Sequence, residues 1–134
     1  MIKSYTNTKT TSDIFKKPSN RSEIISQMIY GENFFIIKKV NEWLKIKTKN
    51  DNYVGYIQNK NYSKQVNPTH KIISLRANIY KLPNKKKASK LKLSFNSKIK
   101  ITERKNKFFR FEKGWIQKNQ IKPINYKDKD PFKK

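Results

Sequence analysis

The chain contains a near-duplicate phrase that limits how it can fold. Residues 55–62 read GYIQNKNY and residues 114–121 read GWIQKNQI. Upstream of these phrases, shifting the chain by 65 residues aligns further similar residues. Aligned pairs include Ile14 with Ile79, Phe34 with Ile99, Trp43 with Phe108 and Ile46 with Phe111. The offset then falls to 59, which brings Gly55 onto Gly114. A constant offset broken by one gap indicates two copies of a single structural unit.

Apolar side chains alternate with polar ones in short runs, as in strands that bury one face. The clearest pairs are Phe34/Ile36, Leu44/Ile46, Ile99/Ile101 and Phe109/Phe111. The stretch SEIISQMI at 22–29 is the best candidate for a short helix and equally well an irregular loop. About five short strands per copy predict an all-β fold of two tandem, small, strongly bent β-barrels. Because units of ~60 residues are marginal alone, we expect the two to dock on each other.

The repeat and the local composition divide the chain into five segments. We expect a flexible N-terminus at 1–11, a first domain at 12–64, a linker at 65–69, a second domain at 70–125 and a basic tail at 126–134. The linker is uncharged and contains Pro68, which is typical of a domain boundary. His70 is the sole histidine, and with no second ligand it indicates a linker residue rather than a metal site.

Composition excludes several kinds of chemistry. The sequence contains no cysteine, which removes disulfides, thiolate metal sites and a cysteine nucleophile. Its 8 Phe, 7 Tyr and 2 Trp argue against a disordered basic tail. The N-terminal residues lack the apolar run of a secretory signal, and the longest apolar stretch, 34–37, is too short to cross a bilayer. We therefore expect a cytoplasmic protein with no membrane partner and no cofactor.

The charge is strongly positive and unevenly distributed. The chain has 33 Lys and Arg against 9 Asp and Glu, a net charge of +24. Residues 70–125 hold 17 of the basic and 2 of the acidic side chains, so most of the field belongs to the second copy. Such a surface attracts polyanions. The candidate contacts are Lys85, Lys86, Lys87, Arg104 and Arg110.

A basic nucleic-acid-binding β-barrel is therefore one functional hypothesis. Lysines would contact phosphates, and Phe108, Phe109 and Trp115 would stack on bases. Against this hypothesis, only 4 of the 33 basic residues are arginine, the side chain best suited to bidentate contacts. The abundance of Lys, Asn and Ile also resembles a compositional bias of the whole chain.

The ordered motifs of the first copy resemble a known family. They are Pro18, Ser22-Glu23, the run Ser26 to Glu32 (SQMIYGE), Trp43 to Ile46 (WLKI) and Asp51 to Ile57 (DNYVGYI). Together they resemble the first bacterial-type SH3 domain of NlpC-like cell-wall cysteine peptidases. The second copy, with LRANIY at 75–80 and GWI at 114–116, is similar to their second SH3 domain. The resemblance spans residues 12–125 and implies SH3-like barrels.

In that family, paired SH3 domains precede a catalytic domain that cleaves peptidoglycan stem peptides with a Cys–His pair. A thiolate mechanism needs a cysteine, so the resemblance implies a non-catalytic relative whose peptidase domain is separate or lost. It also implies roles for Glu32 and Tyr53, which in relatives hold the amino end of the substrate. A carboxylate suits an ammonium and a phenol adds a hydrogen bond. The alternative is that Glu32 ties down its own loop and Tyr53 packs on a hairpin.

Several apolar and aromatic residues have two interpretations each. Trp43, Tyr56 and Trp115 would line a shallow groove for a sugar or peptide, or would serve strand packing. Phe35 and Ile37 align with Lys100 and Thr102, so one copy is apolar where the other is polar. We expect Phe35 and Ile37 to contact the second domain or a partner; the alternative is ordinary scattered surface residues.

The function expected from these observations is binding rather than catalysis. The favoured partner is a peptidoglycan fragment or cell-wall peptide, positioned for an NlpC-like cysteine endopeptidase domain missing from this chain. Nucleic-acid binding is the alternative, and a partial product without independent function is a third possibility. Recognition of Pro-rich peptides is disfavoured because it needs a denser aromatic groove.

Overall fold

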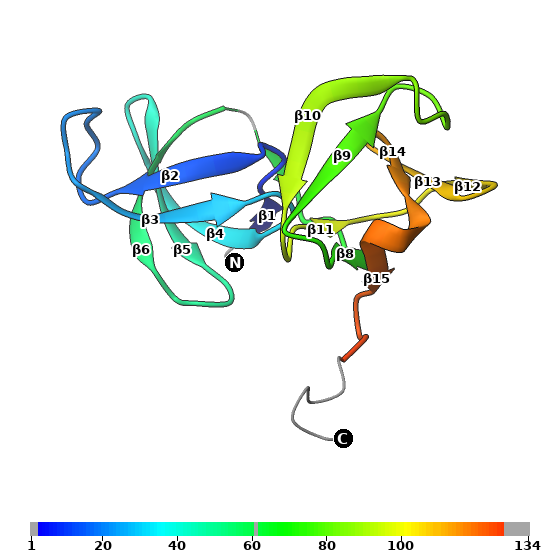
Figure 1. The fold of residues 1–134 in the computed structure, drawn as a ribbon. Helices are drawn as coiled ribbons and strands as arrows, with labels where there is room; N and C mark the ends of the chain where they lie inside the picture. The colour runs from blue at the N-terminus through cyan, green and yellow to red at the C-terminus, as the bar shows by residue number, and fades with distance from the viewer. Residues whose placement is uncertain (1–2, 61, 128–134) are drawn as a thin grey trace, which may run out of the picture. The chain divides into compact units, whose positions relative to one another are not determined.

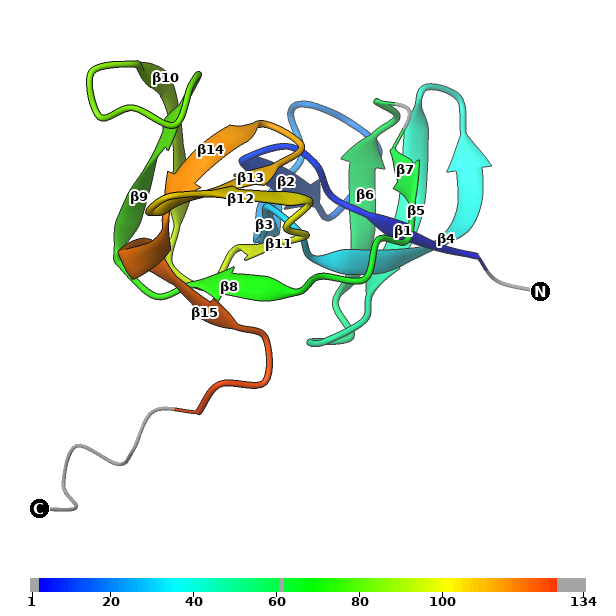
Figure 2. The same ribbon diagram turned by 90° about the vertical axis from the view of Figure 1, so that its right-hand side faces the viewer.

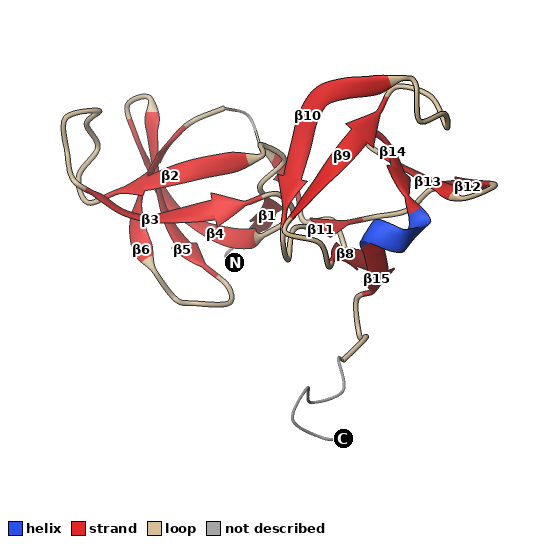
Figure 3. Ribbon diagram, in the orientation of Figure 1, coloured by secondary structure: helices blue, strands red, loops and turns tan. Residues whose placement is uncertain are grey.

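The computed structural model describes residues 3–60 and 62–127 (Figure 1). The chain divides into two compact units, Met1–Asn67 and Pro68–Lys134. Among the described residues, the helical content is one 3-10 turn, η1 (Lys118–Gln120), and the remaining regular elements are strands (Figure 3). The prediction of an all-β fold is confirmed. In this described part of the chain, no helix has the length and apolar character needed to cross a membrane.

The first unit is built on one antiparallel sheet. Its strands are β1 (Ser4–Thr6), β2 (Thr11–Phe15), β3 (Ile24–Ile29), β4 (Asn33–Val40), β5 (Trp43–Thr48), β6 (Val54–Gln58) and β7 (Ser63–Lys64). Their order across the sheet is β3-β2-β6-β5-β4-β1-β7. A register shift between Ile36 and Lys38 bends β4. The stretch SEIISQMI, expected to be a short helix or an irregular loop, instead contains strand β3, because residues 24–29 pair with β2.

The second unit contains two sheets. The strands are β8 (His70–Ile72), β9 (Arg76–Tyr80), β10 (Ala88–Ser94), β11 (Lys98–Ile99), β12 (Glu103–Lys105), β13 (Phe108–Phe111), β14 (Gly114–Gln117) and β15 (Ile121–Pro123). One sheet has the order β10-β9-β14-β13-β12 and the other β11-β8-β15 (Figure 2). The single strand β4 of the first unit corresponds to two strands here, β11 and β12.

The pairing of the strands repeats from one unit to the other. Phe15 faces Tyr56 in the first unit, and Tyr80 faces Trp115 in the second. The outer strands repeat as well: Tyr5 pairs with Phe34 and with Lys64, whereas His70 pairs with Ile99 and with Pro123. All these pairs differ by the offsets of 65 and 59 residues found in the sequence. The duplication is therefore a duplication of hydrogen-bonding register.

The turns repeat even where their side chains differ. Gly31 has φ of 87°, and Asn96 at the equivalent position has φ of 70°. Asn41 and Asn106, also equivalent, both have φ of 56°. Glycine and asparagine are the residues that tolerate this left-handed backbone. The two units thus reverse the chain at the same places with residues suited to it.

Each unit buries its own apolar core. In the first unit the buried cluster comprises Ile14, Met28, Phe34, Leu44, Ile46 and Ile57. In the second unit the buried side chains include Ile72, Ala77, Ile79, Leu93, Ile99, Phe109, Phe111 and Ile116. Of the alternating positions predicted from the sequence, Phe34, Leu44 and Ile46 belong to the first set and Ile99, Phe109 and Phe111 to the second, whereas Ile36 and Ile101 are only partly buried. The shared strand register explains why Ile14 and Ile79, 65 residues apart, are both fully buried.

The same close approach of two strands occurs in both units. A Cβ at Gly55 would lie 2.5 Å from Ile14 Cγ2 and 2.8 Å from the Phe15 carbonyl oxygen. A Cβ at Gly114 would lie 2.6 Å from the Tyr80 carbonyl oxygen, and Gly114 also has φ of 139°. Only glycine, which has no Cβ, allows β6 to lie this near β2 and β14 to lie this near β9. The recurring Gly-aromatic-Ile-Gln phrase is explained by this contact.

The prediction that residues 1–11 form a flexible N-terminus is wrong for Ser4 to Asn7. Residues 4–6 are strand β1, and the Asn7 side chain is fully buried. Asn7 Nδ2 donates to the Ile29 carbonyl at 3.0 Å, and Asn7 Oδ1 accepts from Ser12 Oγ at 2.9 Å. Backbone hydrogen bonds to β4 and β7 hold this segment, and they leave little trace in side-chain pattern.

The predicted linker and tail are shorter than expected. The Gln65 amide donates to the Ser4 carbonyl and the Val66 amide to Thr6 Oγ1, so both residues belong to the first unit. The Thr69 amide donates to the Ile99 carbonyl, so it belongs to the second. In the predicted tail, Lys71 Nζ donates to the Tyr126 carbonyl. Residues 128–134 of that tail lie outside the described residues.

Substitution of either glycine at the strand contact tests the repeated register. We expect Gly55→Ala and Gly114→Ala each to lower the free energy of unfolding by about 2 kcal/mol or more, because the new methyl group overlaps a neighbouring carbonyl oxygen. Urea titration followed by tryptophan fluorescence measures the change. Val54→Ala, at a neighbouring exposed position, should change it by less than about 0.5 kcal/mol. Glycine variants as stable as wild type would contradict the contact.

Candidate functional site

Three aromatic side chains meet on the outer face of the first sheet. Phe15 faces Tyr56 across β2 and β6, and Tyr56 faces Lys45 across β6 and β5. Residues directly opposite each other in antiparallel strands share a face. Trp43 lies two residues from Lys45 on that face, and its ring makes an edge contact with Phe15 at 5.4 Å between centroids. We name Phe15, Trp43 and Tyr56 the first aromatic trio.

The second unit has an equivalent trio, Tyr80, Phe108 and Trp115. Tyr80 and Phe108 make an edge contact with a centroid distance of 5.3 Å, nearly that of Phe15 and Trp43. The two trios differ in exposure. All three rings of the second trio are buried, whereas all three of the first are partly exposed. The first trio is the one that leaves ring surface exposed.

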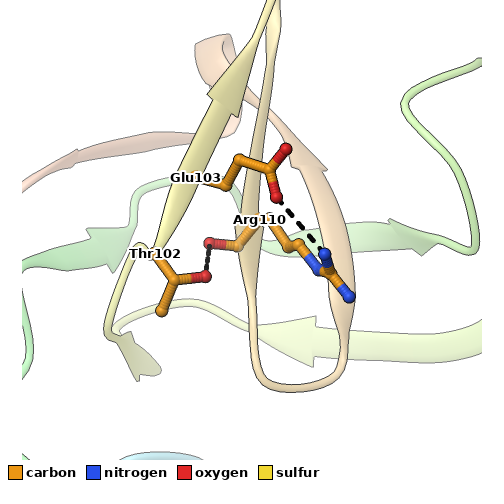
Figure 4. A network of polar contacts seen from close by, with 3 residues as sticks. All are labelled: Thr102, Glu103 and Arg110. Atoms are coloured by element: carbon orange, nitrogen blue, oxygen red, sulfur yellow. Dashed lines mark hydrogen bonds and ion pairs between the residues drawn. The ribbon is translucent and has the colours of Figure 1, made fainter.

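The residues beside the trios differ in charge. Next to the first trio, Lys38 and Lys45 face each other across β4 and β5. At the equivalent place in the second unit, Glu103 faces Arg110. Arg110 Nη1 lies 3.3 Å from Glu103 Oε1, an exposed ion pair seen in Figure 4. Two like charges opposite each other repel. The first unit therefore places two cations beside its open aromatic face. At the equivalent place in the second unit, a cation and a carboxylate neutralise each other.

Arg110 also covers the second trio. Its guanidinium carbon lies 5.8 Å from the Trp115 ring centroid, within the range of a cation–π contact. Its backbone carbonyl accepts from Thr102 Oγ1 at 3.4 Å (Figure 4). Trp115 thus functions in packing, the second of its two interpretations. The interpretation of Tyr56 and Trp43 as groove residues stays a prediction, with an exposed face in its support.

Glu32 and Tyr53 lie at the same end of the first sheet. Glu32 immediately precedes β4, and the Lys49 amide donates to the carbonyl of the next residue, Asn33. The Tyr53 amide donates to Thr48 Oγ1 at 2.9 Å, and the Thr48 amide returns a bond to the Tyr53 carbonyl. Tyr53 is 46% exposed. The substrate-holding roles of these two residues remain predictions.

Phe35 and Ile37 occupy the outer side of β4. Ile37 is 45% exposed and sits at the register shift. Phe35 is partly buried, and the ammonium group of Lys49 lies 5.5 Å from its ring centroid. The proposed contact of these residues with the second domain or with a partner stays a prediction.

The polyanion candidates of the second unit do not form one group. Lys85, Lys86 and Lys87 are exposed in the turn between β9 and β10. Lys85 and Arg104 line a groove of about 1120 Å³, whereas Arg110 lies on the outer face. Lys107, Lys118 and Lys122 also line this groove, and the sequence analysis did not select them. Lys107 and Lys118 are brought together because the Lys118 amide donates to the Lys107 carbonyl at 2.8 Å.

His70 lies at the floor of that groove and is not a linker residue. It belongs to β8, is 9% exposed, and packs edge-on against Phe109 with a centroid distance of 5.7 Å. Thr69 Oγ1 lies 2.8 Å from His70 Nδ1 and already accepts from the Ile101 amide. Which of the two groups donates in the bond between the Thr69 hydroxyl and His70 Nδ1 depends on the tautomer of the ring.

The environment of His70 opposes its protonation. Burial lowers the pKa of His70 below its ordinary value of 6.5, and the positive charge of Arg104 lowers it further. Within residues 3–60 and 62–127, no group of three or more His, Cys, Asp or Glu side chains is placed to hold a metal ion. His70 therefore contributes as a neutral, packed side chain.

Residues 14–61, which carry the first trio and most of the first sheet, match a family described as the bacterial dipeptidyl-peptidase SH3 domain. This segment is therefore similar to bacterial SH3 domains. The match includes Glu32, Trp43, Tyr53 and Tyr56 among the predicted site residues. No curated protein matches the chain. The resemblance predicted from the motifs of the first copy is confirmed.

Solved structures share the fold. The chain is similar to an NlpC/P60 family protein from Bacillus cereus ATCC 10987, with 15% identity and a TM-score of 0.65 over 90% of this chain and 56% of that one. It also matches NlpC2 and NlpC1 from Trichomonas vaginalis at 14% identity, with TM-scores of 0.39 and 0.40. These two matches cover 95% of this chain and 49% and 46% of the respective structures. The Bacillus likeness bears on the fold alone, and this chain spans about half the length of that protein.

The buried histidine predicts a specific pH dependence of stability. Because its pKa is lower in the folded state, the unfolded chain binds more protons as the pH falls through 6.5. The contribution of His70 is complete above that pH and is lost below it. We expect wild type to lose more unfolding free energy than His70→Phe between about pH 7.5 and pH 5. Urea titrations at both pH values measure this, and equal losses in the two proteins would contradict it.

Proposed function

We propose that this chain is a non-catalytic binding module that positions a peptidoglycan fragment for an NlpC-like cysteine peptidase domain lying outside these 134 residues. The observation that carries the proposal is the contrast between the two aromatic trios. The first is partly exposed beside two lysines, and the second is buried beside an ion pair. One unit of a duplicated fold keeps open the face that the other uses for packing.

The chemistry of the open face suits a wall fragment. Partly exposed aromatic rings pack against the apolar faces of sugars and against peptide backbone. A stem peptide also carries free carboxylates, which pair with lysine ammonium groups. Lys38 and Lys45 repel each other in the free protein, so an anion between them removes a cost as well as adding an attraction.

The proposed division of labour follows from the absence of a nucleophile. The 134 residues contain no cysteine, and a thiolate mechanism needs one. The contribution of this chain is then orientation of the substrate, which raises the rate of a neighbouring active site by holding the reacting bond in place. In this scheme Glu32 and Tyr53, at the end of the same sheet, would hold the amino end of the bound peptide.

A charge reversal at one lysine tests the proposal. Lys38→Glu gives the first unit the pairing that the second unit has, a carboxylate facing a cation. We expect it to weaken binding of purified muropeptides about tenfold in isothermal titration calorimetry, because the ligand carboxylate meets a like charge. We also expect equal or higher stability, since a repulsive pair becomes attractive. That combination separates a binding defect from misfolding.

Lys39→Glu is the matched control, because it makes the same charge change at the next residue of β4. Lys39 faces the core residue Leu44 of β5 and not Lys45. It should weaken binding by less than about threefold. Trp43→Ala should also weaken binding about tenfold, and Trp43→Phe should retain most of it because a ring still packs on Phe15. Equal effects of Lys38→Glu and Lys39→Glu, or undiminished binding by Trp43→Ala, would refute the proposed site.

A further inference from the structure

The groove of the second unit combines positive charge with an absence of lining carboxylates. Its described lining residues are His70, Pro83, Lys85, Arg104, Asn106, Lys107, Phe108, Phe109, Gln117, Lys118, Asn119, Ile121, Lys122 and Pro123. Five of these are cationic and none is acidic. A concave surface lined by one sign of charge concentrates counter-ions.

The two described carboxylates of this unit are engaged with other cations. Glu103 lies 3.3 Å from Arg110, and Glu112 lies 3.6 Å from Lys113. Neither carboxylate lines the groove. Within the described part of the second unit, both carboxylates thus pair with cations outside the groove, which leaves the groove cations open to an external anion.

The cations come from separate elements along the groove. Lys85 lies in the β9–β10 turn, Arg104 on β12, Lys107 in the β12–β13 turn, Lys118 on η1 and Lys122 on β15. Two of them are held in position by aromatic rings. The guanidinium carbon of Arg104 lies 4.9 Å from the Phe109 ring centroid, and Lys122 Nζ lies 5.1 Å from that of Tyr126. Charges spread over several elements around one groove fit an extended ligand with repeated charges better than one small anion.

The aromatic rings of the groove argue against base recognition. Phe108 is 6% exposed and Phe109 is 8% exposed. Tyr80 covers Phe108 edge-on, and Arg104 and His70 both lie against Phe109. Single-stranded nucleic acid is held by stacking of bases on open ring faces, and these faces are occupied. The cations of the groove are therefore available to an anionic ligand, whereas its aromatic rings are not available for stacking on bases.

From this arrangement we propose that the second unit binds a linear phosphodiester polymer that lacks bases, such as a chain of polyol phosphates, along the groove of Lys85, Arg104, Lys107, Lys118 and Lys122. Lysine contacts phosphate as a point charge, without demanding the planar geometry of an arginine fork. This site is separate from the aromatic trio of the first unit, so the inference does not depend on the function proposed above.

The test uses the full chain and a synthetic poly(glycerol phosphate) of about ten units, with affinity measured across a salt series. The double variant Lys107→Gln/Lys118→Gln should bind about tenfold more weakly and lower the slope of log K against log salt by about 1.5. The matched control Lys90→Gln/Lys92→Gln removes the same charge from exposed positions on β10, outside the groove. It should lose less than about threefold.

Two further ligands decide the chemical class. An oligonucleotide of single-stranded DNA with the same number of phosphates should bind no more tightly than the polyol phosphate, and polyglutamate of equal charge should bind more weakly. Tighter binding of the oligonucleotide would overturn the proposal in favour of nucleic-acid recognition. Equal losses in the two double variants would overturn it in favour of unspecific polycation behaviour.

Chemical-shift mapping on wild-type protein provides a check that needs no variant. Adding the polyol phosphate should shift the amides of Asn106, Gln117 and Asn119 and the ring of His70, while the amides of β10 stay in place. Shifts spread evenly over all exposed lysines would also overturn the proposal.

Discussion

The close approach of a glycine to a neighbouring strand is the contact on which both units depend. Gly55 and Gly114 begin or enter the last long strand, and in each case the carbonyl oxygen of an aromatic residue occupies the space where a side chain would be. This contact fixes the register of β6 against β2 in the first unit and of β14 against β9 in the second. Register in turn decides which residues face the core and which face outward. The outward residues next to the glycines are Tyr56 and Trp115, the central members of the two trios.

From this common register the two units diverge by substitution on one face. Tyr56 faces Lys45, which in turn faces Lys38, and Trp115 lies under an arginine that a glutamate holds in place. The strand pairing around the two trios is equivalent, so a few side chains change an open aromatic surface into a covered one. Two copies of one fold can thus differ in a single face, which is open in one copy and packed in the other.

The sequence predicted those features that side-chain pattern encodes. The repeat and the alternating strands of the core could be read directly, because burial restricts residue type. The alignment of Gly55 with Gly114 was also visible, and the structure supplied its reason. Strand β1 was missed because three residues held by backbone hydrogen bonds leave no pattern of side chains. Its residue Tyr5 also differs in type from the equivalent residue of β8, His70. Of the two trios, Trp43, Tyr56 and Trp115 were selected as groove residues and Phe108 as a base-stacking residue, whereas Phe15 and Tyr80 were not selected. Phe15 could have been found from its alignment with Tyr80.

The contrast in charge needed the structure for a different reason. Lys38 and Lys45 are seven positions apart, and a register shift in β4 lies just before Lys38, so their pairing cannot be counted from the sequence. The groove cations Lys107 and Lys118 are likewise joined by one backbone hydrogen bond between a turn and η1. Long-range pairing of this kind determines sites, and single-sequence patterns do not report it.

The claim that one register is built twice, outer strands included, is tested most directly by residue-resolved amide hydrogen exchange. In the first unit the Asn7 amide donates to the Glu32 carbonyl at 2.8 Å, and in the second the Ile72 amide donates to the Ser97 carbonyl at 2.9 Å. These bonds occupy equivalent positions, and slow exchange is expected at both, as in core strands. An Asn7 amide that exchanges at the rate of an unfolded chain while Ile72 stays protected would contradict the account.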